Sequence, residues 1–189
     1  MIEFFYNFVS SLEEYNDAYG YHTQYFLEEG GFLTAFLIAL LSAVIITFLF
    51  YFLICNLCNS LSKFYIWIIG LFIAIGGNLL LTKAYVVGGE NNDTGEYSGF
   101  YSSIEQHTSN LNEEFSKNNE ERKKINDAAE TILLNLREEG DEEYAVVDML
   151  YLNNTLWCLT LYILISILIK GTTKYGIAIP CAWPRKLHI

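Results

Sequence analysis

The sequence predicts an all-α integral membrane protein with three transmembrane helices and an extramembrane helical hairpin between the second and the third. The first observation is that three long stretches are uncharged or nearly so, and we expect transmembrane helices over 31–58, 64–83 and 149–169. A helix needs about 20 apolar residues to cross the bilayer core. The second observation is an acidic segment with helical periodicity, 84–148, between the last two spans.

The first 30 residues form an acidic, aromatic arm that we expect outside the membrane. They hold six acidic side chains and no Lys or Arg, so the basic start of a cleavable secretory signal is missing and we expect the arm to be retained. Because an acidic helix is repelled by anionic lipid, docking on protein is favoured for its apolar stripe. The members of this stripe are Phe4, Phe5, Phe8, Leu12 and Tyr15.

The second span contains the candidate helix-packing residues. Gly70, Gly76 and Gly77 lack side-chain bulk, and small residues let membrane helices approach closely. Asn78, beside the glycine pair, is the one strongly polar side chain deep in this span. We expect its amide to hydrogen-bond to another helix rather than to ligate an ion.

The acidic region 84–148 begins with a glycine-rich loop and continues with a heptad pattern. The pattern predicts one helix over 103–138, which ends near Gly140, and a second arm from Asp141 into the third span. Whether the seam packs on its own chain or on a partner stays open at this stage. We take as candidate partner-binding residues Ile104, Leu111, Phe115, Arg122, Ile125, Ile132 and Leu136, with Thr108, Asn118 and Ala129 as weaker seam positions.

The third span starts with Asn153 and Asn154, which fit a headgroup-level entry or a helix–helix contact. The tail 170–189 is basic and contains both prolines of the chain. Aromatic and basic side chains suit a membrane-interface anchor, and we assign that role to Trp183, Arg185 and Lys186.

The charge pattern predicts the orientation. The arm and the 84–148 region are acidic, whereas the link between the first two spans carries only Lys63 and the tail carries four basic residues and no acid. Basic flanks stay on the cytoplasmic or matrix side. We therefore expect a multi-pass protein of a bacterial cytoplasmic or organellar inner membrane, with its N-terminus outside and its C-terminus inside.

No arrangement of residues typical of a catalytic or metal-binding site is found in the sequence. The CxxC of Cys55 and Cys58 has no second ligand pair, and His22, His107 and His188 fall on different predicted elements. The net charge of −11 disfavours nucleic-acid binding. No Asp, Glu, Lys, Arg or His lies well inside a span, which argues against a coupled transporter. We expect no cofactor and no enzymatic activity.

Three function hypotheses remain. The first is a non-catalytic subunit that scaffolds or stabilises a multiprotein membrane complex, in contact with lipids and with other subunits or copies of itself. The second is a homo-oligomeric pore, since three spans with the N-terminus outside and a basic inner tail resemble the topology of one class of phage holins, although the outer loop is longer than that class has. The third is an immunity or inhibitor protein that meets a basic partner with its acidic outer surface.

Overall fold

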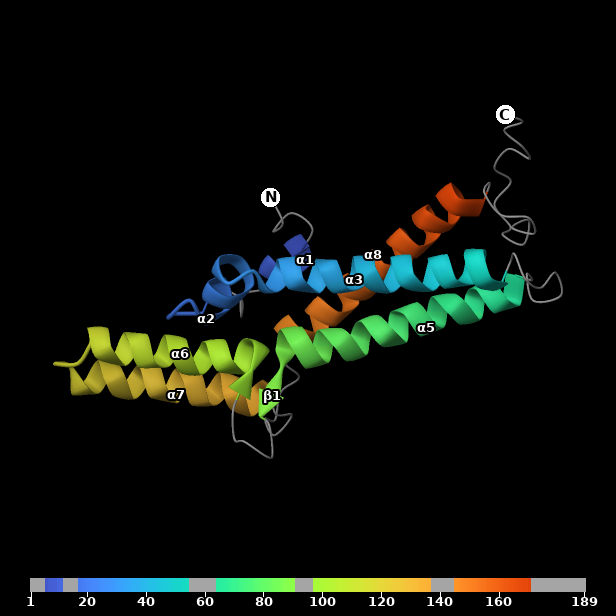
Figure 1. Cartoon of the computed structure of the whole chain (residues 1–189). Helices are drawn as coiled ribbons and strands as arrows, with labels where there is room; N and C mark the ends of the chain where they lie inside the picture. Colours follow the sequence, from blue (N-terminus) through green and yellow to red (C-terminus); the bar gives the residue numbers. More distant parts are fainter. Residues whose placement is uncertain (1–5, 12–16, 55–63, 91–96, 137–144, 171–189) are drawn as a thin grey trace. The chain divides into compact units, whose positions relative to one another are not determined.

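The computed structural model describes residues 6–11, 17–54, 64–90, 97–136 and 145–170 (Figure 1). The chain divides into two compact units. Unit 1 comprises Met1–Ala35 and Leu81–Asn153, and unit 2 comprises Phe36–Leu80 and Asn154–Ile189.

Three helices of the described chain are long and apolar enough to cross a membrane, which confirms that part of the predicted fold. They are α3 (Gly31–Phe48) with the π-helical turn η4 (Leu49–Ile54), α5 (Phe64–Thr82) with the π-helical turn η5 (Lys83–Val87), and α8 (Ala145–Lys170). The candidate spans are Gly31–Ile54, Tyr65–Val87 and Ala145–Ile169. The last two extend a few residues beyond the predicted bounds, because apolar residues also follow Lys83 and precede Met149.

Unit 2 is built from the apolar helices. Ala39 and Ala43 of α3, Ala74 of α5 and Cys158 and Tyr162 of α8 share one buried cluster. Ala39 and Ala43 stand four residues apart, and both are fully buried. This spacing of small residues brings one face of α3 close to its neighbours.

Unit 1 contains the shorter elements. In chain order these are α1 (Asn7–Ser10), α2 (Tyr21–Thr23), the π-helical turn η3 (Gln24–Glu28), β1 (Gly89–Glu90), β2 (Tyr97–Ser98), α6 (Gly99–Glu114) and α7 (Asn119–Leu136). An aromatic core holds them together, with Phe100 of α6 at its centre. The Phe100 ring lies 5.4 Å from the His22 ring, and 5.2 Å from each of the rings of Tyr25 and Phe26.

The prediction of a single helix over 103–138 is wrong. The chain leaves the helix after Glu114 and starts α7 at Asn119, and the two helices pack side by side as a hairpin (Figure 1). The Asn118 side-chain oxygen accepts a hydrogen bond from the Glu121 backbone N–H at 3.2 Å. An Asn cap with an acid three residues later is a helix start signal, and here it prevails over the heptad pattern.

The glycine-rich loop contains a short antiparallel strand pair, in which Gly89 opposes Ser98 and Glu90 opposes Tyr97. The prediction of an all-α protein is therefore corrected by this one short strand pair among the described residues. Gly88 has φ 78°, and a Cβ there would overlap the Ser98 carbonyl. Glycine is required at this position because the two chain segments approach so closely.

Candidate functional site

The polar side chains of unit 2 meet each other between α5 and α8. The Asn154 amide nitrogen donates to the Asn78 side-chain oxygen at 3.0 Å, and both residues are buried. At the other end of the contact, the Trp67 indole N–H donates to the Ser166 hydroxyl at 3.0 Å. Hydrogen bonds between membrane helices contribute about 0.6 kcal/mol each on average.

Gly70 of α5 lies against the Tyr162 side chain of α8. The Tyr162 hydroxyl donates to the Trp67 carbonyl at 3.0 Å, and this places it 2.7 Å from where a Cβ of residue 70 would be. Gly76 and Gly77 differ, because a Cβ at either would have nothing within 4 Å. Of the predicted glycines, the structure brings Gly70 against another helix and leaves the other two beside open space.

Asn78 has the interhelical partner that its position suggested. Its amide nitrogen, by contrast, is buried and has no hydrogen-bond partner among the described residues. The hydroxyls of Ser42 and Thr47 on α3 are likewise buried and have no hydrogen-bond partner among the described residues. Unit 2 thus keeps its polar groups inside, where they specify helix packing.

In unit 1, the segment around α2 is attached to the α6–α7 hairpin by hydrogen bonds. The Tyr21 hydroxyl donates to the Ile125 carbonyl at 3.3 Å and accepts from the Thr108 hydroxyl at 3.2 Å, so it joins both helices. The His107 Nε2 donates to the Tyr19 carbonyl at 2.9 Å. Burial raises the pKa of Tyr21, which keeps its phenol protonated as a donor. The part of the arm around α2 therefore packs on its own chain, whereas the stripe for which docking was expected lies outside the described side chains.

Asp17 organises the start of α2. Its carboxylate accepts from the backbone N–H groups of Tyr19, Tyr21 and His22 at 3.0–3.1 Å and lies 2.8 Å from the His22 Nδ1. Burial alone would raise the pKa of Asp17, but the hydrogen bonds from the His22 ring and from the backbone outweigh it and lower that pKa. The carboxylate is thus held ionised and caps the free backbone N–H groups at the start of α2, although the N-cap residue itself is Gly20.

The residues of the predicted partner-binding seam separate into three sets by their burial. Ile104, Ile125 and Ile132 are buried within unit 1, together with Ala129. Leu111 and Leu136 are half-buried. Phe115 is exposed at the turn that joins α6 to α7, and Arg122 is exposed just beyond it. The buried set packs on its own chain, and the last two residues belong to the hairpin tip.

Several predicted residues lie outside the described chain: the anchor Trp183, Arg185 and Lys186, the pair Cys55 and Cys58, and Phe4, Phe5, Leu12 and Tyr15 of the N-terminal stripe. Among the residues that the structure describes, no group of three or more His, Cys, Asp or Glu side chains could hold a metal ion. The described arrangement can bind protein and pack helices. His22 is 2% exposed, so its pair with Asp17 has little access to a substrate.

Sequence reasoning missed Trp67, Tyr162, Asp17 and Tyr21. A signal existed for the first two, because the polar end of a Trp or Tyr buried in an apolar helix needs a partner. Asp17 stands four residues before the first residue of α2, and Asp is a favoured capping residue. Tyr21 could not be found from the sequence, since its partners lie 87 and 104 residues away.

In comparisons with protein-family models, with curated proteins and with solved structures, no match to this chain is found.

Proposed function

We propose that this chain is a non-catalytic integral membrane subunit that scaffolds or stabilises a multiprotein membrane complex. Its three apolar helices would span the membrane, and the outer surface of the α6–α7 hairpin would contact a partner. The observation that carries this proposal is the inverted distribution of side chains on the apolar helices, with large apolar groups outside and polar groups inside.

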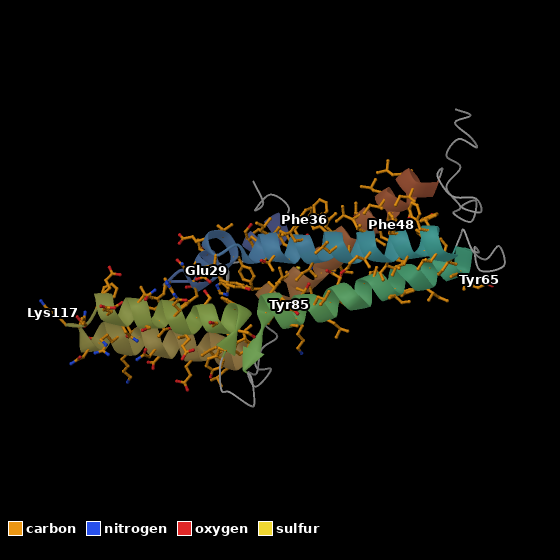
Figure 2. All side chains as sticks on the ribbon, in the orientation of Figure 1. Glu29, Phe36, Phe48, Tyr65, Tyr85 and Lys117 are labelled. Atoms are coloured by element: carbon orange, nitrogen blue, oxygen red, sulfur yellow. The ribbon has the colours of Figure 1, made fainter. Side chains whose placement is uncertain are left out.

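The outward side chains of these helices are large and apolar (Figure 2). Phe72 is 67% exposed, Leu80 73% and Leu168 78%. On a protein in water, such a continuous apolar surface marks a membrane or protein contact. Lipid or neighbouring transmembrane helices would cover it, and the buried Asn78–Asn154 contact would hold the helices in register.

The surface of the α6–α7 hairpin has the opposite character (Figure 2). Its turn carries Lys117, and its outer faces carry exposed Glu105, Glu113, Glu114 and Glu130. With the acidic region outside and the basic tail inside, the proposed orientation keeps the N-terminus outside and the C-terminus inside, in a bacterial cytoplasmic or organellar inner membrane.

The same burial pattern weighs against the pore hypothesis. A pore between copies needs an outward polar stripe, yet Ser42, Thr47, Asn78 and Ser166 are buried within unit 2. Thr160 is exposed, but its hydroxyl donates to the Leu156 carbonyl in its own helix. The helices would have to repack before these groups could line a channel.

The inhibitor hypothesis keeps support from the acidic hairpin surface, since a basic partner would be attracted to it. It differs from the subunit hypothesis in one respect. An inhibitor stays monomeric until its partner arrives, whereas a subunit is found in a stable assembly.

The native mass after gentle detergent extraction from the original host tests the proposal. The monomer is 21.7 kDa. A larger species that contains other polypeptides is the expected result. A species built only from copies of this chain would favour the pore, and conductance in bilayers would then be measured. A lone monomer would contradict the subunit and pore hypotheses and leave the inhibitor.

A further inference from the structure

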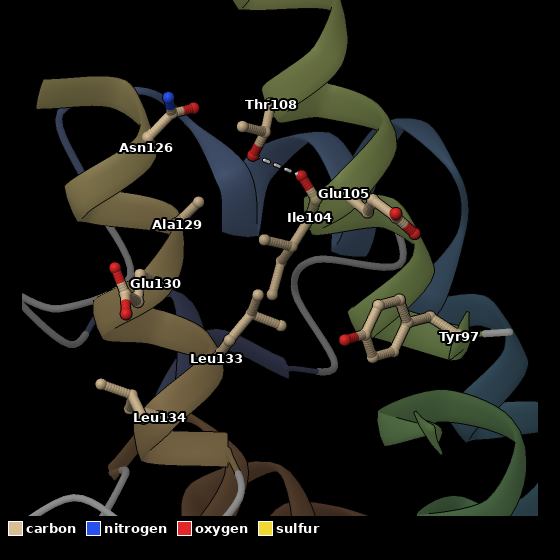
Figure 3. Close-up of a pocket in the computed structure, with 9 residues that line it drawn as sticks. All are labelled: Tyr97, Ile104, Glu105, Thr108, Asn126, Ala129, Glu130, Leu133 and Leu134. Atoms are coloured by element: carbon tan, nitrogen blue, oxygen red, sulfur yellow. Dashed lines mark hydrogen bonds between the residues drawn. The ribbon is translucent and has the colours of Figure 1, made fainter. Parts of the chain in front are cut away.

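The α6–α7 hairpin has an open groove on one side, with a volume of about 360 Å³ (Figure 3). Ile104 of α6 and Leu133 of α7 point toward each other along its floor, and Leu134 is 40% exposed at one end (Figure 3). Ala129 of α7, which has a small side chain, also lines the groove. A volume of this size can take a few aliphatic side chains.

A hydrogen bond joins the two helices beside the groove. The Asn112 amide nitrogen donates to the Asn126 side-chain oxygen at 2.7 Å, and Asn126 also lines the groove.

Acidic side chains border the groove. Glu105 stands on α6 and Glu130 on α7, and both are exposed (Figure 3). Within the described residues, neither carboxylate forms an ion pair, whereas Glu120 and Glu121 lie near Lys124 at the other end of α7. An apolar floor between two unneutralised carboxylates is complementary to an aliphatic side chain with a basic neighbour.

The chain segments that flank the groove in sequence have the wrong charge to fill it. The segment 91–96 carries two acids and no base, and 137–144 carries five acids and one Arg. The basic tail 170–189 is expected on the opposite side of the membrane. Charge complementarity therefore points to a different polypeptide.

We propose that the α6–α7 groove binds a short segment of a partner protein in which aliphatic side chains are flanked by Lys or Arg. The aliphatic groups enter the groove over Ile104, and the basic groups pair with Glu105 and Glu130. This inference rests on the proposed role as a subunit, for which it identifies the contact surface and the chemistry of the partner.

The test uses the full chain in phosphatidylcholine nanodiscs and a fluorescent Lys-Leu-Leu-Lys peptide as the probe, with empty nanodiscs as the reference. The test variant is Glu105→Gln with Glu130→Gln. The matched control is Glu113→Gln with Glu114→Gln, which removes the same charge from exposed positions of α6 that do not line the groove. Circular dichroism checks that each variant keeps its helix content.

The expected result is saturable binding to the wild-type protein. Exposed ion pairs contribute about 0.2–1 kcal/mol each, so loss of both carboxylates should weaken binding about 2- to 30-fold. The control variant should stay within about twofold of the wild type. A Lys-Ser-Ser-Lys probe should bind at least about tenfold more weakly, because it loses two buried leucines.

Four results would overturn the inference: equal weakening in both double variants, equal binding of the serine probe, no binding above that of empty nanodiscs, or tighter binding after removal of residues 176–189. The last result would identify the tail as the occupant. Probe binding does not depend on the native mass of the complex. If the protein is a monomer that binds the probe, only the proposed role as a subunit is refuted. If it is found in a large complex but does not bind the probe, only the proposed binding of a partner segment in the groove is refuted.

Discussion

Gly70→Ala tests the close approach of α5 and α8 directly. The added methyl group would lie 2.7 Å from the Tyr162 hydroxyl, which is closer than real Cβ contacts come. Tyr162 would have to move, and its bond to the Trp67 carbonyl would weaken. Overpacking of a tight interior costs about 1–3 kcal/mol, so we expect the free energy of unfolding to fall by that amount.

Tyr162→Phe should rescue the Gly70→Ala variant. Without the hydroxyl, the nearest ring atom to the new methyl is the Cζ at 3.8 Å, an ordinary van der Waals distance. Tyr162→Phe alone loses one interhelical hydrogen bond, worth about 0.6 kcal/mol. We therefore expect the double variant to be about as stable as Tyr162→Phe alone.

Gly76→Ala is the matched control, since a Cβ there meets nothing within 4 Å. It should leave stability unchanged or raise it slightly, because alanine favours helix by up to about 1 kcal/mol over glycine. All variants would be compared by reversible unfolding in detergent, monitored by tryptophan fluorescence. Equal costs for Gly70→Ala and Gly76→Ala would refute the close approach, and so would a cost of Gly70→Ala that Tyr162→Phe does not reduce.

Three further predictions concern polar contacts. Asn78→Leu and Asn154→Leu should each lower stability by about 0.6–1.7 kcal/mol, with a smaller loss in the double variant than the sum; strictly additive losses would exclude the pair. Asp17→Ala should cost about 1–2 kcal/mol at neutral pH. Because the folded-state pKa of Asp17 is lowered, this difference is present above pH about 4 and should shrink as the pH falls further; a pH-independent difference would contradict the capping role. Tyr21→Phe removes a hydrogen bond to the Ile125 carbonyl that is worth about 1 kcal/mol, so amide hydrogen exchange in α2 should become faster by up to about tenfold. Unchanged exchange would show that the Tyr21 hydroxyl does not hold this segment on the hairpin.

The three apolar helices could be predicted from the sequence because the signal is local. An uncharged run of about 20 residues indicates a membrane helix whatever the rest of the chain does. The polarity of Asn78 likewise predicted a helix contact, whereas Asn154 left a headgroup-level entry open as well; their pairing joins positions 76 residues apart. The Asn118 cap was also a local signal, and the heptad pattern concealed it.

The tertiary structure decided which of the candidates meet. Gly70, Gly76 and Gly77 look alike in the sequence, but only the placement of Tyr162 on α8 separates the first from the other two. The seam isoleucines look equally available to a partner, yet the fold buries them against their own chain once the helix turns back after Glu114. Such outcomes depend on contacts between distant segments, whose free energy no local pattern contains.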